Sequence, residues 1–437
     1  MNGRAPALSL RDISRTFLTF SVMVVVTAVL AGAFGVLTAN GFLRKIHPYI
    51  FFTGFGNSAI LILNRYLTAA IFPELRIDPV RQRTYLYAVC TALLMVAGSM
   101  LADQPLLKAG AGVLMLLVVS QPLLEIIRTL PLRTIWGNVS GRYYIFDVIF
   151  LLNANLGLFA LGLKEAYPTN GIIPFFVTQS SYFLGSSFPL SISAMGFLYT
   201  YAWRRSPKIE LARKLFSIWF DIFVGGVLFF LVVILIGHYL EMMLISHLLM
   251  FGVFALLVTF GVFLNSYFRK HFAHPALAFL LGGLAFLLAT SAFGIMNIYY
   301  GKGILFGTYP PIRQDKMWIY HTHTHAALLG WITLSFTGMI YIVIPAIQKA
   351  GSLELLQTGD PLEQLLDRST MSKAFVQLTL MLLSAGVVIL SFYSGDGITL
   401  GIAGVIYGAA VSLLRRNLMR DPAIDMKGRG PASDESE

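Results

Sequence analysis

Charged residues are scarce in this 437-residue chain. Asp, Glu, Lys and Arg make up 12% of it, which is about half of the share usual in soluble domains. Hydrophobic residues make up 57%, and the mean hydropathy is +0.73. Several apolar runs reach about 18 residues or more, the length that a helix needs to cross a bilayer. This composition excludes a soluble enzyme, a secreted disulfide scaffold and a disordered protein, and it predicts an all-α membrane protein in contact with lipid.

Cysteine is nearly absent too, since Cys90 is the only one. An internal disulfide, a covalent c-type haem motif and a two-cysteine copper site are therefore excluded. The net charge is +11, but Lys and Arg occur singly or in pairs between apolar runs, without a basic stripe. We therefore expect no binding to nucleic acid. The N-terminus has no cleavable signal pattern, and the first apolar run is long enough to span the membrane and remain there.

The apolar runs predict twelve transmembrane helices and no second domain. If alternate loops share one side, 24 of the 32 Lys and Arg residues fall on the side of the N-terminus. The positive-inside rule then places both termini in the cytoplasm and the chain in the cell (inner) membrane. We expect a cytoplasmic segment (1–15), a transmembrane domain (16–416) and a disordered cytoplasmic tail (417–437). The expected spans are 16–40, 48–73, 84–102, 106–129, 143–163, 173–203, 214–237, 240–267, 275–298, 318–345, 374–393 and 398–416.

Histidines are the most informative residues inside the apolar runs, because ionisable groups are costly in a membrane and usually functional. The chain has eight: His47, His238, His247, His271, His274, His321, His323 and His325. His47, His247 and the cluster at 321–325 lie near the starts of spans that begin on the extracytoplasmic side. Imidazoles from distant helices at one depth predict an axially ligated cofactor. The other three histidines fall in short loops, where we expect solvated rings.

The spacing within YHTHTHAALLGW predicts two separate ligand positions. At 100° per residue, His323 and His325 point about 200° apart, so they can serve different cofactors on opposite faces of one helix. His321 and His325 share a face, a spacing that suits a single metal, but the usual partner carboxylates are missing nearby. Gly54 and Gly330 follow His47 and His323 by seven positions. They predict either a side-chain-free patch for a flat ligand or close helix packing.

Two segments resemble a known family. HTHAALLGWITLSFTGMIYIVIP (323–345) is similar to helix 10 of the haem–copper oxidase catalytic subunit, most of all in cbb-type oxidases and nitric oxide reductases. These have a His-x-His pair before a Gly-Trp and a Tyr-rich, Pro-terminated stretch. LRKIHPYIFFTGFGNSAILI (43–62) is similar to the family's helix 2, where an Arg three residues before a His is followed by Gly-x-Gly. The resemblance implies a subunit I-like bundle of twelve helices. The NnrS family of haem- and copper-binding membrane proteins is a second possible relative.

The resemblance also implies a role for individual residues. His47 and His325 would be the axial ligands of a low-spin haem b, and His323 the proximal ligand of a second, high-spin haem. Arg44 would meet a haem propionate, with a plain interfacial anchor as the alternative. The family's copper site takes histidines from helices 6 and 7, whereas 173–203 and 214–237 contain none. Copper is therefore not expected.

Three acids lie in the expected spans near the cytoplasmic side, each close in sequence to an arginine: Glu125 to Arg128, Asp147 to Arg142, and Asp221 to Arg213. Ion pairs with these arginines are the simpler interpretation. A proton path toward the haems, continued by Asn153 and Asn155, is the alternative.

Three functions remain open on the sequence alone. The first is electron transfer between two haems in respiratory, oxygen or nitric oxide chemistry, as an oxidoreductase. The second is a non-enzymatic haem-carrying accessory or sensor subunit. The chain has no soluble copper or c-haem domain, so both would need a redox partner protein or respiratory complex subunits. The third is a twelve-helix secondary transporter, which would contain no visible-absorbing cofactor.

Overall fold

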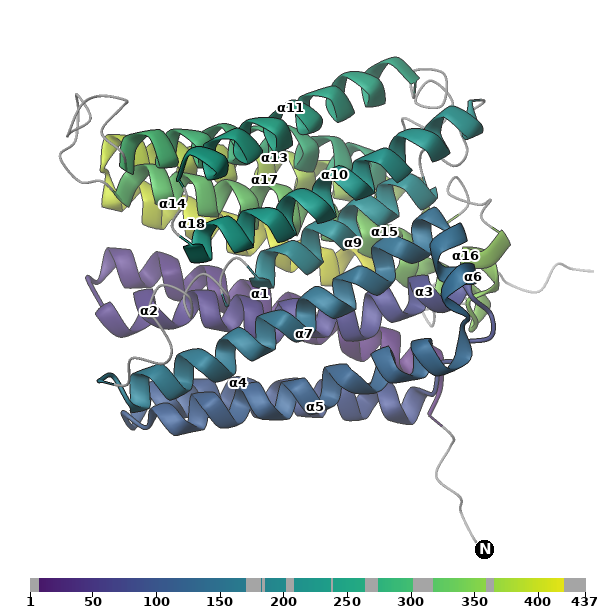
Figure 1. Cartoon of the computed structure of the whole chain (residues 1–437), viewed down its shortest axis with the longest axis horizontal. Coiled ribbons are helices and arrows are strands. Elements are labelled where there is room, and N and C mark those ends of the chain that lie inside the picture. Colours follow the sequence, from purple (N-terminus) through teal and green to yellow (C-terminus); the bar gives the residue numbers. More distant parts are fainter. Residues whose placement is uncertain are drawn as a thin grey trace, which may run out of the picture.

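The chain forms an elongated bundle of helices that run roughly along its long axis (Figure 1). The computed structural model describes residues 8–169, 182, 185–201, 208–236, 239–263, 274–301, 317–358 and 365–419. Every regular element within these ranges is a helix. The all-α fold expected from composition is therefore confirmed for the described residues.

Nine helical segments of the described chain are long and apolar enough to cross a membrane, and they coincide with nine of the twelve expected spans. Two of the nine are composite helices. Gly41–Ile71 joins α2 (Gly41–Tyr49), η1 (Ile50–Gly56), η2 (Ala59–Asn64) and α3 (Arg65–Ile71), and Met317–Ala350 joins α14 (Met317–His325), η5 (Ala326–Thr333) and α15 (Leu334–Ala350). The other seven are α1 (Leu10–Leu37), α4 (Pro79–Leu101), α5 (Pro105–Thr129), α7 (Val139–Ala166), α13 (Pro275–Gly301), α17 (Arg368–Ser394) and α18 (Gly397–Leu418).

Helices also occupy the described parts of the three other expected spans: α9 (Gly185–Tyr201), α10 (Ile209–Ile236) and α11 (Tyr239–Phe263). The expected ranges 173–203, 214–237 and 240–267 include residues outside the description, so a total of twelve spans stays a prediction. Two short helices, α6 (Leu132–Gly137) and α16 (Glu354–Thr358), complete the set.

The first helix begins earlier than the expected boundary at residue 16. Ser9 caps α1, since its hydroxyl accepts from the Asp12 amide while the Asp12 carboxylate accepts from the Ser9 amide. This capping box satisfies the free amides of the first turn, and residues 10–15 are helical as a result. The last helix likewise extends two residues beyond 416, to Leu418.

The two composite helices lie at the centre of the bundle. Within their most apolar windows 89% of the residues are buried, against 33–61% in the other seven spans. Both begin at the end of the bundle that is remote from the N-terminus (Figure 1), and we call this the histidine end. His47 lies in α2 (Gly41–Tyr49), and the cluster at 321–325 lies in α14 (Met317–His325).

Each composite helix widens into π-helical turns directly after its histidines. The turns are η1 (Ile50–Gly56), η2 (Ala59–Asn64) and η5 (Ala326–Thr333). Such turns are rare and often lie at functional sites.

Side chains satisfy carbonyls within the π turn of η5. The Thr333 hydroxyl donates to the carbonyl of Leu328 at 2.6 Å, and the Tyr407 hydroxyl donates to that of Leu329 at 2.6 Å. Because buried carbonyls need partners, these two hydroxyls stabilise the wide turn below the histidines.

Candidate cofactor site

His47 and His325 face one another across the histidine end. Their ring centroids are 6.1 Å apart, and the ring planes differ by 28°. Two imidazoles that bind one metal from opposite sides through bonds of about 2 Å have ring centres roughly 6 Å apart. The structure thus brings together two of the predicted ligands, from segments far apart in the sequence, at a separation that fits a shared metal.

The backbone sets the tautomer of both rings. Nδ1 of His47 lies 2.7 Å from the carbonyl oxygen of Arg44, and Nδ1 of His325 lies 2.8 Å from that of His321. A carbonyl can only accept, so each Nδ1 carries the proton and donates it. Nε2 of both rings then has a free lone pair, which is the state that a metal ligand needs.

Small and aromatic residues shape the surroundings of the pair. A Cβ atom at Gly32 of α1 would lie 3.4 Å from the His47 ring. On the other side, the Phe392 ring of α17 packs against His325 at a centroid distance of 4.6 Å and stacks on His321. Both rings of the pair are only half-buried although helices surround them. The His47 ring therefore packs against a glycine of α1, and the His325 ring packs against Phe392 of α17.

His323 points away from this pair, as the two-residue spacing predicts. Its Nδ1 donates to the carbonyl of Thr290 in α13 at 2.8 Å. A Cβ atom at Gly294, one turn further along α13, would lie 3.0 Å from the His323 ring. The ring is half-buried and also has Nε2 free. α14 thus carries two imidazoles that backbone carbonyls orient on different faces: His325 lies toward His47, and His323 lies toward α13.

Arg44 takes part through its backbone, because its carbonyl orients His47. The side chain is exposed at the histidine end and packs so closely on α1 that a Cβ atom at Gly35 would lie 2.8 Å from its Cγ. This position is compatible with either predicted role of the guanidinium, a propionate contact or an interfacial anchor.

Gly54 and Gly330 do not form open patches beneath the histidines. A Cβ atom at Gly54 would lie 2.6 Å from Val24, and one at Gly330 would collide with Phe286. Gly54 lies inside the π turn η1 and Gly330 inside η5, so a count of 100° per residue misplaces them. Close helix packing, the alternative interpretation, explains both glycines.

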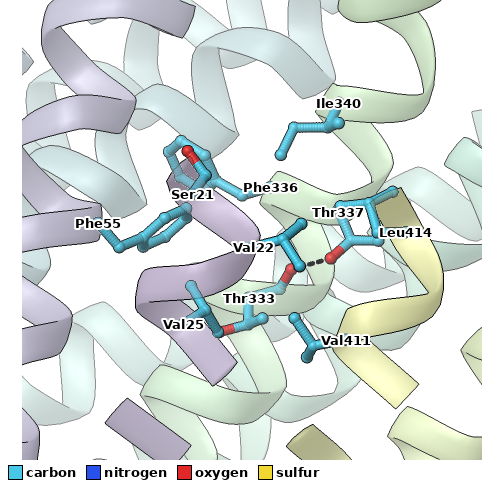
Figure 2. Close-up of a pocket in the computed structure, with 10 residues that line it drawn as sticks. All are labelled: Ser21, Val22, Val25, Phe55, Thr333, Phe336, Thr337, Ile340, Val411 and Leu414. Carbon is cyan, nitrogen blue, oxygen red and sulfur yellow. Dashed lines mark hydrogen bonds between the residues drawn. The ribbon is translucent and has the colours of Figure 1, made fainter. Parts of the chain in front are cut away.

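A small cavity lies deeper between the composite helices, among α1, η1, α15 (Leu334–Ala350) and α18 (Figure 2). Phe55 and Thr333, which line it, each follow a histidine of the facing pair by eight residues. The lining is mostly apolar, and the buried Ser21 hydroxyl has no hydrogen-bond partner. The helices therefore enclose a small, mostly apolar space at this depth.

The remaining histidines lie apart from the pair. His247 donates from Nδ1 to the carbonyl of Met243 at 2.7 Å, and its Nε2 lies 3.3 Å from the Tyr299 hydroxyl. His274 was expected to be solvated, but it is 2% exposed. Its Nδ1 accepts from the amide of Ala276, so it caps α13. The predictions for His238 and His271 lie outside the described residues.

The expected partners of the three acids were wrong. Glu125 pairs with Arg65 at 2.6 Å, and Asp221 lies 3.9 Å from Arg142. Asp147 forms no ion pair with any described residue. The helices bring cations from other segments closer to the first two acids than the nearest arginines in sequence.

Sequence reasoning missed the residues that surround the imidazoles: Gly32, Thr290, Gly294 and Phe392. They belong to other helices and have no spacing relation to the histidines, so a single sequence contains no signal for them. Within the described ranges, no group of three or more His, Cys, Asp or Glu is arranged to hold a bare metal ion. Two facing imidazoles instead suit a metal whose other ligands come from a macrocycle. No protein-family model matches the chain, and no curated protein is significantly similar to it.

Proposed function

We propose that this protein is an integral membrane haem protein in which His47 and His325 are the axial ligands of a low-spin haem b. The observation that supports this most strongly is the pair of facing imidazoles at 6.1 Å, each with its Nδ1 proton donated to a backbone carbonyl. Haem supplies reversible one-electron chemistry when bound. The protein's contribution is to present two neutral, preoriented nitrogens.

We further propose that His323 is the proximal ligand of a second, high-spin haem on the side of α13. Its Nδ1 is oriented in the same way, and the absence of a Cβ at Gly294 lets the ring pack closely against α13. His325 and His323 are two residues apart, so α14 would connect the two sites with a short protein path. This arrangement is suited to passing electrons from one site to the other in oxygen or nitric oxide chemistry.

Both sites lie near the histidine end, so we propose that a redox partner protein or a respiratory complex subunit docks there. With both termini in the cytoplasm of a cell (inner) membrane, that end faces outward. The Phe392 ring of α17 packs against both His325 and the neighbouring His321 and so holds this side of the proposed site in place.

The test is a set of alanine variants with a matched histidine control. The full chain is purified in detergent from cells supplied with haem, and oxidised and reduced visible spectra are recorded. We expect His47→Ala and His325→Ala each to remove the sharp low-spin bands. His247→Ala removes a similarly oriented imidazole whose Nε2 faces the Tyr299 hydroxyl instead of a second imidazole, and it should leave these bands intact. Equal low-spin spectra in all three variants would contradict the ligand assignment.

A further inference from the structure

Asp147 lies within the α7 span and is completely buried. The helices packed against α7 are α5, α6, α9, α10 and the composite helix Gly41–Ile71. It belongs neither to the histidine pair nor to the His323 site. An ionisable group at such a position is costly to keep and is a candidate for function.

The two oxygens of this carboxyl group have different environments. The Asn64 amide and the Ser193 hydroxyl both donate to Oδ2. Oδ1 is buried and has no hydrogen-bond partner. Two donors on one oxygen are the pattern expected for the carbonyl oxygen of a carboxylic acid, which leaves Oδ1 as the atom that carries the proton.

The two buried arginines of these helices, Arg65 and Arg142, have other partners. Arg65 of the composite helix pairs with Glu125 of α5. Arg142, on α7 itself, donates to Ser217 of α10 at 2.8 Å and lies 3.9 Å from Asp221.

Other charged groups on these helices are exposed or paired elsewhere: Arg128, Arg133 and Lys214 are exposed, and Arg213 pairs with Glu210. Lys108 of α5 pairs with Glu165, and α9 has no charged residue within its bounds. Tyr144, on the same helix as Asp147, lies 3.2 Å from the Thr200 hydroxyl. No described cation therefore compensates a charge on Asp147.

We propose that Asp147 is a proton-binding site inside the membrane domain, held as a neutral carboxylic acid with its proton on Oδ1. An isolated ionised carboxylate in an apolar interior is so costly that the group takes up a proton instead. The two hydrogen bonds to Oδ2 fix the orientation of the acid. This inference is independent of the haem assignment, because no residue of the histidine sites takes part.

The polar side chains around Asp147 continue toward the end of the bundle opposite to the histidine end. The Thr68 hydroxyl lies 2.9 Å from the Asn64 side-chain oxygen, one turn further along the composite helix. Arg65, the residue after Asn64, pairs with the partly exposed Glu125. In the other direction, buried Leu151 separates the acid from the next polar residue of α7. The proton therefore exchanges with solvent from the Glu125 end.

Infrared spectroscopy of the purified full chain in lipid nanodiscs tests the proposal. At neutral pH we expect the carbonyl stretch of a protonated carboxylic acid, and Asp147→Asn should remove it. Asp221→Asn, at a side chain that is 62% exposed, is the matched control and should leave the band unchanged. If Asp147→Asn removes only carboxylate bands, Asp147 is ionised and the proposal is wrong.

Ser193→Ala keeps the acid and so covers the case in which Asp147→Asn fails to fold. Loss of one hydrogen bond to Oδ2 should shift the carbonyl band to higher wavenumber, and an unshifted band would contradict the proposed geometry. Thr68→Val tests the direction of access. It should slow the deuterium-induced shift of the band after transfer to D2O, whereas an unchanged rate would overturn exchange from the Glu125 end. Failure of the haem assignment would alter none of these results.

Discussion

Four histidine rings are oriented by the same hydrogen bond, in which Nδ1 donates to a backbone carbonyl. They are His47, His247, His323 and His325. This hydrogen bond alone does not define a metal site, because it also orients many structural histidines. What distinguishes the candidate ligands is their surroundings: a facing imidazole for His47 and His325, and a bare glycine for His323. Helical spacing alone predicted that His323 and His325 diverge. The contact between His47 and His325 depends on how distant helices pack, which a single sequence does not reveal.

The bare glycine beside His323 gives a prediction at the residue scale. In Gly294→Ala, the new Cβ would lie 3.0 Å from Cε1 of His323 and 3.1 Å from Nδ1. The ring must then shift slightly, which disturbs its hydrogen bond to the Thr290 carbonyl. We expect the carbon monoxide-sensitive part of the reduced spectrum to fall strongly, while the low-spin bands remain.

Gly386→Ala is the control for this substitution. A Cβ atom at Gly386 of α17 meets nothing within 4 Å, and both changes raise helix propensity to a similar extent. The control should bind carbon monoxide like the natural chain. Full carbon monoxide binding in Gly294→Ala would show that the glycine does not serve the proposed second site.

At the scale of the element, the histidine helices are distinguished by their π turns. Hydropathy predicted both helices, because their apolar residues are nearly continuous. It could not predict the wide turns. A π turn changes the number of residues per turn, and a segment that is apolar on every face shows no periodicity in which this change could be seen. The prediction that Gly54 and Gly330 lie beneath histidines was wrong for that reason.

The hydroxyl of Tyr407 should be essential to the wide turn of η5. Tyr407→Phe leaves the buried carbonyl of Leu329 without its 2.6 Å donor. An unsatisfied buried polar group costs about 1–3 kcal/mol, and we expect the free energy of unfolding in detergent to fall by this amount. Tyr87→Phe, at a side chain that is 63% exposed, should change it by less than about 0.5 kcal/mol. Equal stabilities of the two variants would rule out the proposed support of the turn.

At the scale of the whole molecule, buried charges connect helices that are distant in sequence. Glu125 of α5 accepts from Arg65 of the composite helix at 2.6 Å and from Arg81 of α4 at 2.8 Å. Arg65 is only 5% exposed, so its charge depends on this partner. Sequence reasoning placed Glu125 near a membrane boundary, but it could not choose among the arginines of other helices.

Removal of Glu125 should therefore be costly. Glu125→Gln leaves Arg65 buried without a counter-charge, and breaking a buried pair costs about 3 kcal/mol or more. Denaturant unfolding in detergent measures the loss. Glu210→Gln is the matched control, because Glu210 is 74% exposed in its pair with Arg213 and such pairs contribute about 0–1 kcal/mol. A similar loss in both variants would contradict the role of Glu125 as a buried link between three helices.

The number of spans is also testable, because an even number places both termini on one side. Twelve spans predict that Asn2→Cys and Ser436→Cys, each in a Cys90→Ala background, react with an impermeant maleimide only when the cytoplasmic face is exposed. If the nine described spans were the total, the two cysteines would react from opposite faces. Hydropathy predicted the nine described spans, but not their exact ends: α1 begins at Leu10 beneath its Ser9 cap and ends at Leu37, whereas 16–40 was expected.

The most direct test of the central claim is the cofactor content of the purified chain. The protein is produced with ample haem, and a pyridine haemochrome assay is combined with oxidised and dithionite-reduced spectra. The account predicts about two b-type haems per chain, one low-spin and one that shifts with carbon monoxide. A colourless protein would contradict the haem assignment, and the facing histidines would then be a structural contact within a membrane protein of another function.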